Sequence, residues 1–369
     1  MLRRAFSSAA RPLGSVVPHQ KIIFSGIQPT GSLHLGNYLG AISHWVSLQD
    51  AGYDKLFYSI VDLHAITLPQ DPQVLKQGIR DMTCALLACG IDPDRASLFV
   101  QSDVSQHSEL AWLLGCITPY SLLATMTQFK EKSKGDKVNL GLYSYPVLMT
   151  SDILLYKATH VPVGEDQTQH LELAVKLARL FNNRFCGQRQ QKEEEGQEKE
   201  EEGQEVAYFP EPAPQIDNER GVRRVMSLKD GTKKMSKSDP SDLSRVNLTD
   251  TADQIRKKVR KAKTDLTDGI TYCPQSRPDL ANLLHIFSAL SACSVESLLA
   301  DYSTAEKSVF KAGLVEVLVE HITPIGQEIN RLSSDVGYVD SVLQRGADEA
   351  TNVAAANMAE IRALVGLGS

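Results

Sequence analysis

Short apolar runs alternate with longer amphipathic stretches over the first half of the chain. The apolar runs have the length of buried strands, and the stretches between them repeat apolar residues at helical spacing. Strands are therefore predicted at 21–25, 55–61, 97–101 and 160–163, and helices at 35–48, 72–89, 109–116, 145–156 and 165–185. Strands that alternate with helices predict an α/β fold built on a doubly wound parallel sheet.

The second part of the chain has a purely helical pattern. After about Asp250 the strand signals end, and helices are predicted at 251–263, 279–293, 305–332 and 338–365. Pro324 should break or kink the third of them, because proline removes a helical hydrogen bond. We expect an all-helical segment to follow the sheet domain.

Two classes of protein are disfavoured by the composition. No stretch approaches the ~20 consecutive apolar residues of a membrane span, so we expect a soluble protein without a membrane partner. The six cysteines form no C-x-x-C pair and have no zinc-finger spacing, which predicts free thiols and no metal site built from protein ligands.

Charge is unevenly distributed along the chain, whose net charge is -6. Residues 187–205 hold eight Glu against three basic residues and no apolar side chain, which predicts a disordered acidic insertion. The stretch 255–263 is strongly basic. It could contact nucleic-acid phosphates, or it could be a solvated helix face.

The N-terminal residues 1–18 form a basic segment. They contain three arginines, three serines and no acid, and Leu2, Phe6 and Ala9 fall on one helical face. This composition is typical of a mitochondrial transit peptide, and a disordered tail is the alternative. We therefore expect the protein in the mitochondrial matrix.

A glycine-rich turn joins the first predicted strand to the first predicted helix. Its residues 25–40 include Gly26, Gly31 and Gly36, which let a backbone approach a ligand closely. Open α/β sheets bind nucleotides at such a place, with the phosphates at the start of a helix. His34 in this turn could donate a hydrogen bond to a phosphate, or it could be an ordinary core histidine.

A lysine-rich loop at 233–239, Lys-Lys-Met-Ser-Lys-Ser-Asp, lies between the sheet domain and the helical segment. Such a loop can fold over a triphosphate and neutralise charge as pyrophosphate leaves. Alone it would be interpreted as a solvated loop. Together with the His34 turn it predicts ATP chemistry.

These two motifs resemble the signatures of class I aminoacyl-tRNA synthetases, as His34-Leu-Gly-Asn37 and Lys234-Met-Ser-Lys-Ser238. Segments at 24–31, 60–66, 126–132, 151–156 and 161–167 resemble tryptophanyl-tRNA synthetases of the bacterial and mitochondrial type. The resemblance extends from about Lys21 to the end of the chain, except for the acidic insertion.

The resemblance implies a Rossmann-type catalytic domain at 19–230, the lysine loop and a helical anticodon-binding domain at 231–369, and a homodimer. It also implies an activity: L-tryptophan is activated with ATP and then transferred to tRNA(Trp), here for mitochondrial translation. Mg²⁺ would be held mainly by the phosphates.

Individual roles follow from the same resemblance. The catalytic residues would be His34, Lys234 and Lys237. The residues expected to bind ATP are Gln28, Gly36, Asn37, Gly164, Lys234, Met235, Ser236 and Lys237. Those expected to bind tryptophan are Phe24, His64, Met149, Asp152, Val163 and Gln167.

Asp152 lies in an otherwise apolar stretch, 147–155. A buried carboxylate there is costly unless something donates to it. From the residues alone, a helix cap or part of an internal ion pair is the favoured interpretation. The resemblance implies that it accepts the indole N–H, which would reject phenylalanine because the acceptor would then lie unpaired.

Three other functions remain to be weighed. Tyrosine activation by the sister enzyme is disfavoured by the 151–156 and 164–167 patterns. A nucleotidyltransferase without an RNA substrate is disfavoured by the helical C-terminal segment. A non-catalytic RNA-binding or regulatory descendant is disfavoured by the intact His34, Lys234 and Lys237.

Overall fold

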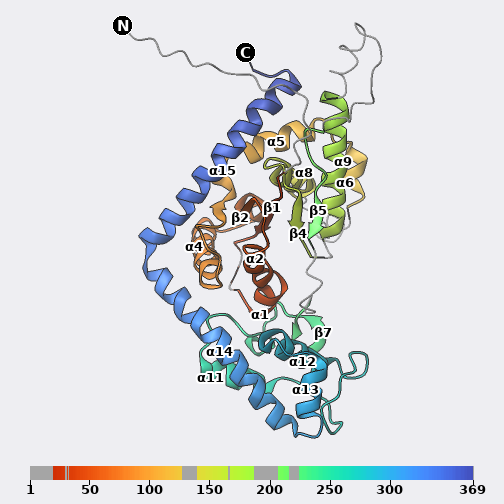
Figure 1. The fold of residues 1–369 in the computed structure, drawn as a ribbon, viewed down its shortest axis with the longest axis vertical. Coiled ribbons are helices and arrows are strands. Elements are labelled where there is room, and N and C mark those ends of the chain that lie inside the picture. The colour runs from red at the N-terminus through yellow and green to blue at the C-terminus, as the bar shows by residue number, and fades with distance from the viewer. Residues whose placement is uncertain are drawn as a thin grey trace.

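The computed structural model describes residues 20–29, 31, 33–126, 139–164, 167–186, 207–215 and 224–368 (Figure 1). The predicted transit peptide at 1–18 and the predicted acidic insertion at 187–205 lie outside these residues.

The centre of the fold is a five-stranded parallel sheet with the order β3-β2-β1-β4-β5. Its strands are β1 (Ile22–Ile27), β2 (Lys55–Ile60), β3 (Ser97–Val100), β4 (His160–Pro162) and β5 (Ala213–Gln215). The chain leaves β1 to build first one side of the sheet and later the other. The strand order therefore reverses between β1 and β4, which is where open α/β sheets bind ligands. The predicted doubly wound α/β fold is confirmed.

Helices cover both faces of this sheet. They are α1 (Leu35–Asn37), the π-helical turn η1 (Tyr38–Ile42), α2 (Ser43–Leu48), α3 (Asp62–Ala65), α4 (Pro72–Ala88), the 3-10 turn η2 (Gln101–Asp103), α5 (Gln106–Gly115), α6 (Tyr120–Ala124), α8 (Leu140–Leu154) and α9 (Thr168–Phe185). The helix predicted at 35–48 is thus one helical run that contains a π-turn.

Alternate residues of the strands point into two separate cores. Ile23, Tyr58 and Leu98 belong to the core that continues into the helical segment, and Phe24 and Phe57 belong to the core under α8 and α9. Both faces of the sheet are buried, as expected for a parallel sheet.

The rest of the chain is mainly helical. It holds a short antiparallel hairpin, β6 (Met226–Ser227) with β7 (Asp230–Lys234), and the 3-10 turn η4 (Asp242–Ser244). Its helices are α11 (Ala252–Lys261), α12 (Pro278–Ser291), α13 (Val295–Tyr302), α14 (Lys307–Ser334) and α15 (Val336–Val365). Pro324 lies inside α14, so the break that we considered there does not occur.

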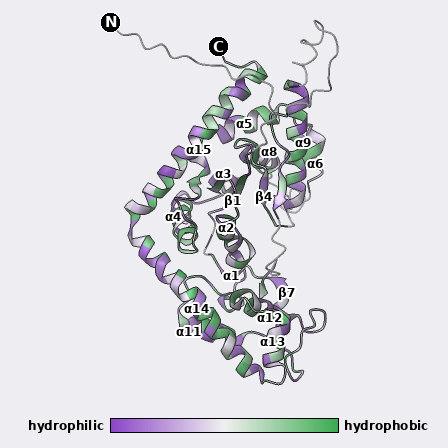
Figure 2. Ribbon diagram, in the orientation of Figure 1, coloured by the Kyte–Doolittle hydropathy of each residue, from purple (hydrophilic) through white to green (hydrophobic). Residues whose placement is uncertain are grey.

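The two longest helices, α14 and α15, run along one side of the elongated molecule (Figure 1). Hydrophobic and hydrophilic residues alternate along both of them (Figure 2). Within the described ranges no single helix is long and apolar enough to cross a membrane; the bent pair α12 and α13 meets that test by length and composition alone.

The final helix, α15, covers the edge strand β3. A Cβ atom at Gly346 would lie 2.0 Å from the carbonyl oxygen of Leu98, so only glycine permits this approach. Ion pairs fasten the helix on either side of that contact, from Arg345 to Asp94 and from Arg362 to Glu109. A helix from the end of the chain therefore completes the fold of its first half.

Candidate functional site

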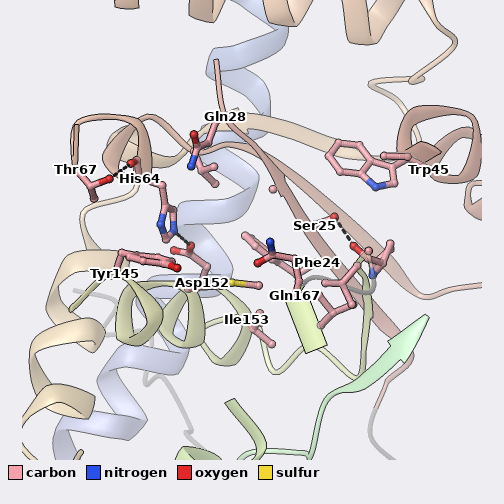
Figure 3. A pocket seen from close by; sticks show the side chains of 18 residues that line it. Phe24, Ser25, Gln28, Trp45, His64, Thr67, Tyr145, Asp152, Ile153 and Gln167 are labelled. Carbon is pink, nitrogen blue, oxygen red and sulfur yellow. Dashed lines mark hydrogen bonds and ion pairs between the residues drawn. The ribbon is translucent and has the colours of Figure 1, made fainter. Parts of the chain in front are cut away.

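A cavity of about 330 Å³ opens at the carboxyl ends of β1 and β4, where the strand order reverses (Figure 3). All six residues predicted to bind tryptophan line it, and so do Gln28 and Gly164 from the predicted ATP site. Its lining also includes residues that we did not predict, among them Ser25, Trp45, Thr67, Tyr145 and Ile153.

Asp152 supplies the buried charge of this cavity. It is 1% exposed and accepts three hydrogen bonds of 2.7 Å. The donors are Nε2 of His64, Nε2 of Gln101 and Nδ1 of His107. Figure 3 shows the His64 ring directed at the Asp152 carboxylate. An ionised carboxylate has about four acceptor sites, so three donors leave about one for a ligand.

The protonation of this cluster follows from its hydrogen bonds. Burial raises the pKa of Asp152, but hydrogen bonds from His107 and His64 outweigh burial and lower the pKa below its usual range. Because the carboxylate is ionised and only accepts, Nδ1 of His107 must donate to it. Nε2 of a neutral His107 ring then accepts from the Tyr156 hydroxyl, 2.9 Å away. The chain of donors therefore ends on the carboxylate.

The rest of the cavity is largely apolar and aromatic. Phe24 stacks on Tyr156 with ring centroids 5.6 Å apart, and Met149 and Val163 add apolar surface. Tyr145 also lines the cavity, and its hydroxyl lies 2.9 Å from Nε2 of His170. An apolar cavity with one buried acceptor fits a flat aromatic ligand that carries a single N–H group.

The His34 turn lies at the start of α1. The backbone N–H of Gly36 donates to Nδ1 of His34 at 3.1 Å, and the Asn37 side chain accepts from the His34 backbone N–H at 3.1 Å. With Nδ1 used as an acceptor, the proton of the neutral ring lies on Nε2, which can donate to a ligand. The sequence thus builds a capping box that fixes the orientation of the histidine.

Positive charge surrounds this histidine. Burial and three neighbouring cations lower the pKa of His34 from 6.5 to about 4. The cations are Arg245, Lys234 and Lys237. His34 is therefore a neutral donor near pH 7, in surroundings that favour an anionic ligand.

The lysine loop lies against this turn. Met235 is buried, and its Cβ would be 3.5 Å from a Cβ built on Gly36. The Lys237 side chain passes beside Gly31, where an added Cβ would come within 2.8 Å of Lys237 Cδ. Lys234 ends β7, and the Ser236 hydroxyl lies 2.8 Å from that of Ser238. The structure therefore brings together the two motifs that lie about two hundred residues apart in the sequence.

Two residues that support this site were not predicted from the sequence. Gln101 and His107 hold Asp152, and the one signal available was that Gln101 directly follows the strand β3 at its carboxyl end. The basic stretch 255–263 is also not cationic on all sides. Lys258 is 3% exposed and pairs with Asp250 at 2.6 Å, so it cannot be a phosphate contact.

Comparison with known proteins agrees with this geometry. The family of class I tRNA synthetases (W and Y) matches residues 19–322. The chain therefore belongs to the class I tRNA synthetases of this family.

Relatives at 45–46% identity carry the tryptophan specificity of that family in their names. The Tryptophan–tRNA ligase of Brucella melitensis is 46% identical over 354 residues, which cover 94% of this chain and 97% of the relative. The ligase of the same name from Nostoc is 45% identical over 346 residues, 93% and 97% of the two chains. The predicted class I tryptophan–tRNA ligase, and its resemblance to tryptophanyl-tRNA synthetases, are confirmed.

Solved structures show the same relationship. The tryptophanyl-tRNA synthetase of Mycoplasma pneumoniae has a TM-score of 0.77 at 33% identity and covers 95% of this chain and 99% of its own. That of Campylobacter jejuni, solved with ADP and tryptophan, has a TM-score of 0.75 at 30% identity and covers 94% and 100%.

The predicted location in the mitochondrial matrix is wrong. The relatives at 45–46% identity, such as those from Brucella melitensis and Nostoc, come from bacteria. The prediction depended on the composition of 1–18 alone, and a basic, acid-free tail of that length is too weakly constrained to define a compartment.

Proposed function

We propose that this protein activates L-tryptophan with ATP to form tryptophanyl-adenylate and pyrophosphate, and then transfers the tryptophanyl group to tRNA(Trp). The observation that carries this proposal is the junction of two features. An aromatic cavity with one buried carboxylate, Asp152, is lined by Gly26 and Gln28 of the glycine-rich turn, and the same turn carries His34 and contacts the lysine loop.

In the first step the tryptophan carboxylate attacks the α-phosphate of ATP. No protein base is needed, because the attacking carboxylate is already ionised. Catalysis then consists of positioning and charge stabilisation. The Nε2–H of His34 donates to the phosphates, and Lys234 and Lys237 neutralise the negative charge that develops on the leaving pyrophosphate. In the second step the 2′-hydroxyl of the terminal tRNA adenosine attacks the adenylate carbonyl; an ester bond forms, the acyl–phosphate bond breaks, and AMP and the hydroxyl proton leave.

Mg²⁺ is included in the proposal as an ion held mainly by the phosphates. Among the described residues, no group of three or more His, Cys, Asp or Glu side chains could form a metal cage, and the charged neighbours of His34 are cations. Mg²⁺ prefers oxygen ligands and is often held by substrate phosphates. The residues around His34 therefore fit an ion held by the phosphate oxygens and not by protein carboxylates. When bound, the ion would supply additional positive charge to the phosphates.

The tRNA would contact the exposed face of α11. Lys257, Arg260 and Lys261 are exposed there, whereas Lys258 points inward. Lysine and arginine side chains in such a row neutralise successive backbone phosphates.

A second copy of the chain would cover the outer face of the pocket helices. Trp112, Tyr120 and Leu140 are 73%, 75% and 77% exposed, and Tyr143 stacks on Tyr120 with centroids 5.2 Å apart. These residues lie on α5, α6 and α8, which pack together, and α8 also carries Asp152. Large exposed aromatics gathered on neighbouring helices favour a protein interface. We therefore place the homodimer contact on this surface.

The test is ATP–pyrophosphate exchange with the full-length chain, run with each of the twenty amino acids. Exchange with tryptophan alone is expected. Exchange with tyrosine would keep the mechanism but overturn the role of Asp152. A chain that exchanges with no amino acid would not be an activating enzyme. Charging of tRNA(Trp) under the same conditions tests the second step.

A further inference from the structure

The segment that follows the lysine loop is hydrogen-bonded to the His34 turn. The backbone N–H of Leu35 donates to the carbonyl of Val246 at 2.8 Å, and that of Leu248 donates to the carbonyl of Leu33 at 3.1 Å. These two bonds form an isolated antiparallel bridge between His34 and Asn247. These bonds therefore fix the last part of this segment relative to His34.

Arg245 connects that fixed segment to the loop. Its Nη1 donates to the carbonyl of Asp239, the last residue of the loop, at 3.1 Å. Its Nε donates to the Asn247 side chain at 3.1 Å, and its Nη2 lies 3.1 Å from the Asp242 carboxylate. The guanidinium group thus makes contacts in three directions, and its side chain is only 17% exposed.

A buried ion pair extends this connection to α11. Nζ of Lys258 lies 2.7 Å from Asp242 and 2.6 Å from Asp250. Asp250 in turn accepts from the Asn247 backbone N–H at 2.9 Å. The hydrogen bond from Lys258 is the main reason that the pKa of Asp242 is lowered. The lysine that the sequence assigned to the basic face of α11 therefore supports the carboxylate that orients Arg245.

We propose that Arg245 is a positioning residue that sets the lysine loop against the His34 turn, so that both reach one triphosphate. This inference rests on the proposed function, because it assigns no role to Arg245 apart from the phosphate chemistry of those two motifs. Arg245 acts through the loop backbone: the guanidinium contacts described above are with protein groups. The network of Asp242 and Lys258 holds the guanidinium plane in place and joins the loop to α11, the helix proposed to contact the tRNA.

The geometry of the group matters more than its charge. A guanidinium presents several N–H donors in a fixed plane, which matches a carbonyl, an amide oxygen and a carboxylate at once. A lysine ammonium in the same place would keep the charge but could not span these three acceptors. The two substitutions therefore separate positioning from simple electrostatics.

The experiment compares full-length Arg245→Ala and Arg245→Lys with the parent in tryptophan-dependent ATP–pyrophosphate exchange. The matched control is Arg256→Ala, an exposed arginine nearby that pairs only with Asp253 among the interactions described for it. Both Arg245 variants should lose kcat/KM for ATP on the order of 10- to 100-fold, the effect of losing hydrogen bonds that involve a charged group. Tryptophan binding measured by calorimetry without ATP should not change.

A double-mutant cycle with Lys237→Ala tests whether Arg245 works through the loop. If it does, Lys237→Ala should cost much less in the Arg245→Ala background than in the parent. Full activity of Arg245→Lys, or additive effects of the two substitutions, would overturn the proposal. If Arg245→Ala does not fold, Asp242→Asn offers a second test, because Asp242 is exposed and its substitution should be tolerated. This variant should lose kcat/KM for ATP to a smaller extent than the Arg245 variants. An unchanged kcat/KM for ATP would count against the proposal.

Failure of this inference is distinguishable from failure of the proposed function. A parent chain without tryptophan-dependent exchange would overturn the function itself. A parent that exchanges normally, with Arg245 variants that match it, would leave the function intact and overturn only the role of Arg245.

Discussion

Replacing Asp152 with asparagine tests the centre of the pocket with almost no change in volume. The carboxylate receives three protein donors at 2.7 Å and has about one acceptor site left. An amide oxygen has two acceptor sites, fewer than the three protein donors require. The variant therefore has no site left for an indole N–H, and one protein donor loses its partner.

Both losses have an expected magnitude. A hydrogen bond to a charged group contributes ~1.5–3 kcal/mol, so the unfolding free energy should fall by about that amount. For a ligand the same energy corresponds to a loss on the order of 10- to 100-fold in kcat/KM for tryptophan. Phenylalanine has no N–H to offer and leaves that acceptor site of the parent unpaired, so its kcat/KM should not fall, and discrimination between the two should fall by at least the same factor.

The assay is amino-acid-dependent ATP–pyrophosphate exchange with tryptophan and with phenylalanine, beside urea unfolding of each variant. Thr83→Val is the control, because the buried Thr83 hydroxyl donates to the Ile79 carbonyl in α4, away from the cavity. If Asp152→Asn folds and its ratio of tryptophan to phenylalanine kcat/KM equals that of the parent, Asp152 does not read the indole.

Three further predictions concern the phosphate and tRNA contacts. Lys237→Ala should lower kcat for exchange by ~10²–10³, as the loss of one charge-stabilising donor does, while Lys233→Ala leaves it unchanged. Because the pKa of His34 is about 4 in the folded chain and 6.5 unfolded, stability should fall as pH drops from about 6.5 to about 4. The unfolding free energy, measured by urea titration at several pH values in that range, should depend less steeply on pH in His34→Asn than in the parent. An identical pH dependence would refute the lowered pKa of His34. Lys257→Ala and Lys261→Ala should each reduce the slope of the logarithm of the tRNA-binding constant against the logarithm of salt concentration by about 1. The control Lys76→Ala, in α4, should leave that slope unchanged.

The fold was accessible from the sequence because its strands are short apolar runs with amphipathic helices between them. β5 was missed because its three residues, Ala-Pro-Gln, carry no apolar signal. The hairpin β6–β7 was missed for a similar reason, since β6 has only two residues. Such strands are defined by their neighbours in space and not by their own pattern.

The residues that line the site could be predicted from the sequence, but the residues that support them could not. Its lining residues were predicted from a family resemblance, and they do meet in one cavity. Two of the three partners of Asp152 were not predicted: Gln101 and His107 lie 51 and 45 residues away in the chain, and no local pattern connects them to Asp152. Lys258 was misjudged for the same physical reason. A local pattern shows that a side chain is charged, but its burial and its partner at Asp250 depend on tertiary contacts.

The contact between Gly346 and Leu98 also bears on how the protein is made. Chains fold from the N-terminus as they are synthesised, so the sheet forms well before α15 exists. Until those last residues leave the ribosome, β3 presents an open row of backbone N–H and C=O groups that another chain could pair with. A protein truncated before α15 would keep its predicted catalytic residues yet carry a permanently open sheet edge. Premature termination would therefore be expected to yield an aggregating fragment rather than a smaller enzyme.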